Sequence, residues 1–288
     1  MTENTLNKKY TTKKEFFKQY KKKSRLQEIW QRFLKNKLAV VGLVLFTLIV
    51  LVAIFAPLIA DYDNDEHIFG TDEMGRDIFA RIVHGARISL MVGLSSVLIA
   101  LLIGGAFGAI AGFFGGKIDN VIMRSMDVFL CLPDVLLALA IVAAFGTSLV
   151  NMTIAIGLSF TPKFSRVVRS AVMSVRGIEY IEAARAIGAT NKRIISHHVL
   201  INCIGPIIVQ VTLYVANAIL TISALSFIGL GIQAPTPEWG NMLASGRAFM
   251  RDNAYIVMAP GFAIFITILS LNLLGDGLRD ALDPRLKQ

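Results

Sequence analysis

Charge is scarce in this sequence. Only 17% of its 288 residues are Asp, Glu, Lys or Arg, whereas 55% are hydrophobic. An ordinary soluble domain carries about 25% charged residues. The apolar residues gather in runs of about 18 or more, the length that a helix needs to cross a membrane. The shortage of charge therefore argues against a soluble domain and indicates several membrane-spanning helices.

Cysteine and histidine are also rare. The two cysteines, Cys131 and Cys203, lie in apolar runs, which argues against a disulfide framework or a cysteine metal site. The four histidines lack metal-ligand spacing, and no nucleophile stands in a catalytic pattern. The sequence GGKI at Gly115 lacks the upstream glycine and the Ser or Thr of a phosphate-binding loop. We therefore expect no catalytic residue, no metal site and no cofactor in this chain.

Acidic residues are fewer than basic ones, 20 against 29, which gives a net charge of +9. No basic stripe lies on a soluble domain, so we expect no nucleic-acid partner. In a membrane protein, Lys and Arg gather instead in cytoplasmic loops. The basic segment 1–37 is thus predicted to be cytoplasmic, and the acidic loop 61–87 external. The basic loop 163–198 and the tail 276–288 are then cytoplasmic, so both termini lie on that side.

Six apolar runs are predicted to span the membrane as helices. They are too long for barrel strands, and an open sheet is excluded in lipid. The predicted fold class is therefore all-α, a polytopic membrane helical bundle. The third run is the least uniformly apolar, because it contains Arg124, Asp127 and Asp134. Arg124 and Asp127 are three positions apart, a spacing at which they can form an ion pair. The runs cover about 38–60, 88–114, 121–145, 149–165, 199–228 and 254–274.

A polar helical stretch, EAARAIGATNKRIISHHVL, interrupts the apolar sequence from Glu182 onward. Its first part favours a helix that Gly188 can end, and Thr190 or Asn191 can begin another. Ala183, Ala184 and Gly188 would let another backbone approach closely. Taken alone, the residues fit either a helix on the membrane surface or a docking surface for a soluble partner.

Two patterns occur inside the predicted spans. Glycines recur every fourth position at 104, 108, 112 and 116, which favours close helix packing within the chain or between subunits. In the fifth span, polar residues form a stripe that fits either interhelical hydrogen bonding or a wall of a translocation pathway. Ile219 is predicted to face lipid beside it. The stripe consists of Gln210, Tyr214, Asn217 and Thr221.

The polar stretch resembles the cytoplasmic EAA loop of permease subunits in ATP-binding-cassette (ABC) importers. Four more stretches are similar to the second, C-type permease of oligopeptide, dipeptide and nickel importers, and residues 35–60 resemble its extra N-terminal span. Ile201 stands where the family loop usually has a proline. The four stretches are FGTDEMGRDIFARIVHGARISL, IDNVIMRSMDVFLCLPD, GLGIQAPTPEWGNML and LGDGLRDALDPRL.

The resemblance implies the type I importer permease (MetI-like) fold over about 88–275. It also implies that the protein lies in the cell membrane, in contact with lipid. The implied partners are a second homologous permease, two ATP-binding subunits that hold ATP and Mg²⁺, and an external substrate-binding protein. Residues Glu182, Ala183, Ala184 and Gly188 would contact an ATP-binding subunit and couple it to the spans. Peptides are the implied substrate, with nickel or a metal chelate as the alternative within the family.

Two other classes remain as alternatives. A self-contained channel or secondary transporter is disfavoured because the chain lacks an inverted repeat and paired broken helices with buried charges. A membrane-embedded enzyme is disfavoured because no catalytic constellation is present.

Overall fold

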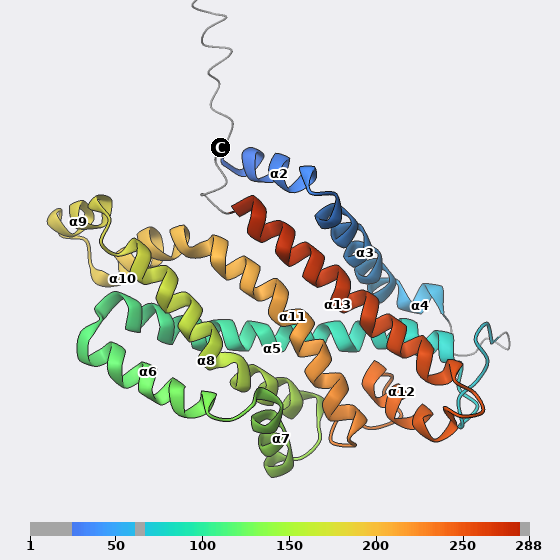
Figure 1. The fold of residues 1–288 in the computed structure, drawn as a ribbon. Helices are drawn as coiled ribbons and strands as arrows, with labels where there is room; N and C mark the ends of the chain where they lie inside the picture. The colour runs from blue at the N-terminus through green and yellow to red at the C-terminus, as the bar shows by residue number, and fades with distance from the viewer. Residues whose placement is uncertain (1–24, 61–66, 283–288) are drawn as a thin grey trace, which may run out of the picture.

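The computed structural model describes residues 25–60 and 67–282. The predictions for 1–24, 61–66 and 283–288 therefore lie outside the described residues. Within the described ranges all regular structure is helical, apart from one isolated bridge between Thr71 and Asp77. The fold is thus the predicted all-α bundle (Figure 1).

The helices follow one another in this order along the chain: α2 (Arg25–Lys35), α3 (Lys37–Ile54), α4 (Ala56–Ile59), α5 (Ile78–Phe114), α6 (Gly116–Leu130), α7 (Asp134–Phe145), α8 (Leu149–Val175), α9 (Glu179–Ala186), α10 (Asn191–Arg193), η1 (Ile194–Val199), η2 (Leu200–Cys203), α11 (Ile204–Phe227), α12 (Trp239–Gly246), η3 (Arg247–Phe249) and α13 (Tyr255–Leu282). Several ends differ from the predicted spans. Helix α5 begins well before residue 88 because Asp77 accepts a hydrogen bond from the Phe79 N–H and caps it there.

Four helical stretches of the described chain are long and apolar enough to cross a membrane: α3, α5, the continuous stretch Asn191–Phe227, and α13. Helices α6 and α7 pass the same test only when the bent pair is taken together as one span. Helix α8, which contains the fourth predicted span, does not reach this apolarity. Its second half carries Lys163, Arg166 and Arg169, and their partners are described below.

The third predicted span, 121–145, is formed by two helices rather than by one straight helix. Helix α6 ends at Leu130, α7 begins at Asp134, and the two are bent by 83°. Pro133 lies at the break, where it has no N–H to continue the hydrogen-bonding of α6. Asp134 follows in the first turn of α7, where the helix dipole favours a carboxylate.

The seam between α5 and α8 is formed by backbone contact. A methyl group on Gly104 would lie 2.3 Å from the Thr161 carbonyl oxygen, and one on Gly108 would lie 2.3 Å from that of Ser165. One on Gly112 would lie 2.9 Å from the Arg169 oxygen. Packing within the chain is therefore confirmed for these three glycines. Gly116 differs, because it begins α6 at positive φ with open space around it.

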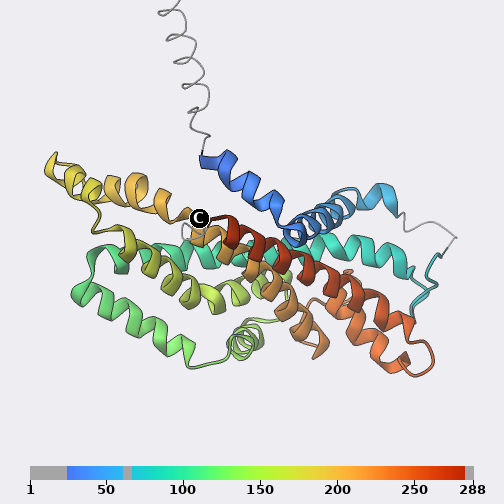
Figure 2. The same ribbon diagram turned by 45° about the horizontal axis from the view of Figure 1, so that its top comes forward.

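The two ends of the bundle are built differently. Helix α9 lies at one end, beside the C-terminal end of α5, whereas α4 and α12 lie at the opposite end (Figures 1 and 2). Helix α13 runs beside α3 and α11 through the middle of the bundle, and Gly277 of α13 touches Ala39 of α3. This arrangement separates the polar stretch from the motif that precedes α5 by the length of the bundle.

Candidate coupling surface and pathway cavity

Helix α9 ends in a well-formed cap. The Gly188 N–H donates to the Arg185 carbonyl and the Ala189 N–H donates to the Ala184 carbonyl, with Gly188 at a φ of +83°. These two bonds are the Schellman arrangement, which requires a left-handed residue and so favours glycine. The prediction that Gly188 ends this helix is confirmed. Thr190 precedes α10, as predicted, although its side chain makes no capping hydrogen bond.

One face of α9 packs inward. Ile181 is fully buried and Ala184 is 6% exposed, and both join a cluster with Val168 and Val172 of α8 and Ile194 of η1. Helix α9 is therefore attached firmly to the end of α8. Ala184 supports this attachment rather than an outer contact surface.

The other face of α9 is open. Glu182, Ala183 and Gly188 are exposed, and Ile187 projects with 86% of its surface exposed. Ile187 was not among the predicted contact residues, although its apolar side chain beside a helix-ending glycine was a usable signal. We call Glu182, Ala183, Ile187 and Gly188 the α9 tip.

The chain leaves the polar stretch without the usual proline at position 201. A π-helical turn, η1, and a 3-10 turn, η2, lead into α11, and Ile201 is exposed. Pro206 lies in the first turn of α11, where its missing N–H breaks no helical hydrogen bond. The altered exit therefore still produces a continuous path from α10 into α11.

The predicted polar stripe lines a cavity over most of its length. Tyr214, Asn217 and Thr221 border a cavity of about 690 Å³, together with Phe160 and Lys163 of α8 and residues 130–135 at the break between α6 and α7. Gln210 is not part of this lining, and its side chain hydrogen-bonds to Tyr214. The prediction that Ile219 faces lipid was wrong, because it is fully buried against Gly93 of α5.

Three ion pairs join α8 to the bent pair α6–α7. Arg169 binds Asp119 through two hydrogen bonds of 2.5 and 2.6 Å, and Arg166 binds Asp127 at 2.9 Å. The expected Arg124–Asp127 pair was wrong, because Asp127 reaches across to α8 instead. The third pair, between Lys163 and Asp134, lies on the cavity wall and gives Asp134 a partner. We call these pairs the α8 ladder: Asp119–Arg169, Asp127–Arg166 and Asp134–Lys163.

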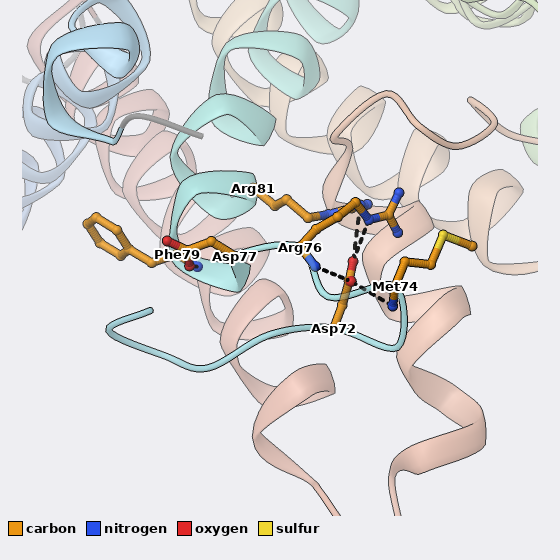
Figure 3. A network of polar contacts seen from close by, with 6 residues as sticks. All are labelled: Asp72, Met74, Arg76, Asp77, Phe79 and Arg81. Carbon is orange, nitrogen blue, oxygen red and sulfur yellow. Dashed lines mark hydrogen bonds and ion pairs between the residues drawn. The ribbon is translucent and has the colours of Figure 1, made fainter. Parts of the chain in front are cut away.

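The motif that precedes α5 folds around Asp72 (Figure 3). Its carboxylate accepts hydrogen bonds from the Met74 and Arg76 N–H groups and from Arg76 Nε at 2.8–2.9 Å, and it pairs with buried Arg81 at 3.2 Å. Asp72 and Arg81 line a small pocket together with Met242 of α12 and Ile256 of α13. The motif thus forms a compact, charge-stabilised cap on this end of the bundle.

Helix α12 is fixed beside that cap. Glu238 is fully buried and its carboxylate accepts from the Gly240 and Asn241 N–H groups at 2.8 Å. Burial raises the pKa of Glu238, while these N–H groups and the nearby Ser226 and Ser89 hydroxyls act in the opposite direction. Trp239 then donates from Nε1 to the Ile82 carbonyl at 2.9 Å, which joins α12 to α5.

Curated relatives cover almost the whole chain. The dipeptide transport system permease protein DppC of Alkalihalophilus pseudofirmus is 49% identical over 93% of each chain. The di/tripeptide permease DppC of Pseudomonas aeruginosa is 46% identical over 92% of this chain and 93% of that one. The glutathione transport system permease GsiD of Pectobacterium atrosepticum is 40% identical over 91% of both.

Solved structures share the fold at low identity. The MetNI methionine ABC transporter in an inward-facing conformation matches with a TM-score of 0.58 at 18% identity, over 72% of this chain and 98% of that one. An amino acid ABC transporter matches with a TM-score of 0.53 at 14% identity, over 70% of this chain and 94% of that one. These matches support the predicted MetI-like fold and say nothing of substrate.

Family models agree with the motifs quoted above. Residues 24–75 match the N-terminal TM domain of oligopeptide transport permease C. Residues 104–288 match the model described as binding-protein-dependent transport system inner membrane component. Together with spanning helices in the described chain, these matches make it a multi-pass membrane protein and confirm the resemblance. The chain therefore belongs to the family of inner membrane components of binding-protein-dependent transport systems.

Proposed function

We propose that this chain is one permease subunit of an ATP-driven importer of short peptides. Support for the peptide substrate comes from the relatives named for dipeptide, di/tripeptide and glutathione transport, which are 40–49% identical. The observation that carries the proposal is the α9 tip. It is an exposed helix end, with an exposed Ile187, held rigidly on the end of α8.

The α9 tip suits a contact that transmits force. Its inner face buries Ile181 and Ala184 against α8, so a push on the tip moves α8 with it. Its outer face offers small residues and one apolar side chain to a groove on an ATP-binding subunit. Two such subunits, which bind ATP and Mg²⁺, supply the hydrolysis, and this chain is not an enzyme.

The cavity beside α11 supplies part of the translocation pathway. Tyr214, Asn217 and Thr221 give it uncharged polar groups. A second homologous permease completes the pathway from the facing side, and an external substrate-binding protein delivers the peptide to the end that carries Asp72 and α12. In this orientation the α9 tip and both termini are cytoplasmic.

Reconstitution tests this function directly. The chain, its second permease and the ATP-binding subunits are placed in proteoliposomes with the substrate-binding protein, and uptake of a labelled dipeptide is measured. Uptake that requires ATP and each subunit is the expected result. Dipeptide uptake in the absence of ATP and the ATP-binding subunits would instead support a self-contained transporter.

A further inference from the structure

The cavity beside α11 carries two opposite charges on an otherwise mixed wall. Lys163 and Asp134 pair on its surface, where their side chains remain 35% and 22% exposed. Leu132, Val135 and Leu220 add apolar surface to the same wall. The volume of about 690 Å³ lies within the range of about 300–1,000 Å³ that is typical of small-molecule sites.

We propose that Lys163 and Asp134 form a transient binding site for the two charged termini of a short peptide. The inference rests on the proposed function, and it adds to that function a chemical basis for accepting zwitterionic peptides. Asp134 would pair with the peptide ammonium group and Lys163 with the peptide carboxylate.

The exchange of partners is electrostatically balanced. Opening the Lys163–Asp134 pair leaves one cation and one anion, and a zwitterionic peptide supplies the matching anion and cation. Two charge-assisted contacts thus replace one, so neither charge is left unpaired on the partly exposed wall. Lys163 can follow the peptide because its charge stands on a flexible four-carbon stem. Its ammonium already lies 5.8 Å from the centre of the Tyr214 ring.

The rest of the wall suits the middle of a peptide. Asn217 donates from Nδ2 to the Leu213 carbonyl, which orients its side-chain oxygen as an acceptor for a peptide N–H. Thr221 donates to the Asn217 carbonyl and keeps its hydroxyl oxygen as an acceptor. The apolar residues contact peptide side chains without selecting among them. The site therefore recognises the charged termini and the backbone of a peptide, and does not select for its side chains.

Photolabelling of the assembled importer in lipid nanodiscs, without the binding protein, tests this site. The probe is a dipeptide of alanine and a diazirine analogue of leucine, with both termini free. We expect adducts on residues 130–135 or 214–224. Unlabelled Ala-Leu should block them, whereas acetyl-Ala-Leu-amide should need about tenfold higher concentration because both charged contacts are lost.

Two variants separate binding from structure. Asp134→Asn with Lys163→Gln keeps a neutral hydrogen-bonding pair, so competition by free and capped dipeptides should become equal. Leu220→Trp leaves the ion pair intact and fills the cavity from a position that is 53% exposed, so labelling should fall about tenfold. The second variant keeps the test decisive if the first does not assemble.

Three results would overturn the inference: adducts only outside the cavity, equal competition by capped and free dipeptides in the parent, or a neutral pair that still prefers free termini. If the second permease covers the cavity residues and they are not labelled, this result also overturns the inference. ATP-dependent dipeptide uptake by the parent is measured in parallel. Uptake without cavity labelling refutes this site alone, whereas absence of uptake refutes the proposed function.

Discussion

Helix α8 packs differently on its two sides. Toward α5 it meets glycines at such short range that an added methyl would lie 2.3 Å from the backbone oxygens of Thr161 and Ser165. Toward α6 and α7 it holds the α8 ladder, whose middle pair is half exposed, with Arg166 at 62% and Asp127 at 45%. The contact of α8 with α5 is therefore a close backbone contact, whereas its contact with α6 and α7 adds long charged side chains to apolar packing between α7 and α8.

The difference assigns the two seams different mechanical roles. The glycine seam makes α5 and α8 move as one body, and the α9 tip is attached to that body through Ile181 and Ala184. We expect any relative shift of α6 and α7 to occur at the ladder, whose last pair, Asp134–Lys163, borders the cavity. A force on the α9 tip would thus displace α8, and this displacement would change the ion pairs of the α8 ladder beside the cavity.

The largest effect is expected at the α9 tip. Gly188→Leu places a side chain at a φ of +83°, which costs about 1 kcal/mol, and overpacks a fitted contact by about 1–3 kcal/mol more. Docking of the ATP-binding subunits should weaken by about one to three orders of magnitude. Pull-down of those subunits and ATP-dependent uptake measure this loss.

Two milder variants serve as comparisons for Gly188→Leu. In Gly188→Asn, the asparagine tolerates the left-handed conformation and adds little bulk. Glu182→Lys changes only a surface charge. Both should retain more docking than the leucine variant. Normal recovery of ATP-binding subunits with Gly188→Leu would indicate that the segment merely lies on the membrane surface.

The glycine seam should be the next most sensitive region. Gly104→Ala or Gly108→Ala forces α5 and α8 apart at a backbone contact, and we expect a loss of about 1–3 kcal/mol in unfolding free energy. Gly105→Ala is the matched control, because its added methyl would meet only ordinary contacts, the nearest at 3.6 Å. Thermal unfolding in detergent measures all three. Equal tolerance at positions 104 and 105 would contradict the rigid seam.

Substitutions in the α8 ladder should lower the unfolding free energy less than those in the glycine seam. Arg169→Gln removes a two-bond pair with Asp119 that is partly buried, so we expect destabilisation of about 1 kcal/mol. Arg166→Gln affects an exposed pair and should change the unfolding free energy by less than about 0.5 kcal/mol. Thermal unfolding again gives the comparison. If both ladder variants match the glycine variants in damage, the contrast between the seams does not hold.

The smallest effect is expected in the cavity wall. Asn217→Leu removes a polar group from the proposed pathway, so uptake should slow about threefold to tenfold, a change of about one hydrogen bond, while assembly stays intact. Ile208→Ala, at an exposed position of α11 outside the cavity lining, is the control. Uptake rates at saturating peptide measure both. Equal uptake rates for the two variants would indicate that the polar stripe serves only helix packing.

Local chemistry explains why much of the fold was predictable. The left-handed Gly188 acts through its own backbone, the spacing of Gly104, Gly108 and Gly112 places them on one helix face, and the apolar runs indicate spans directly. Such features depend on a residue and its chain neighbours. The motifs likewise identified the family before any contact was known.

Most of the misses depend on contacts between distant residues. Asp127 lies three positions from Arg124, yet its partner Arg166 is on another helix. Ile219 is apolar in a spanning helix, and only its contact with Gly93 distinguishes core from lipid. The break after Leu130 was signalled by Pro133, but the 83° bend brings Asp134 to Lys163 in a way that the sequence alone does not specify.

Photocrosslinking at two exposed apolar positions tests the central claim most directly. Ile187 at the α9 tip is 86% exposed, and Leu58 of α4, at the opposite end of the bundle, is 83% exposed. Each is replaced in turn by a benzoylphenylalanine residue in the assembled importer with its binding protein. We predict that position 187 crosslinks to an ATP-binding subunit and that position 58 does not. A crosslink to an ATP-binding subunit from position 58, or only lipid adducts from position 187, would contradict it.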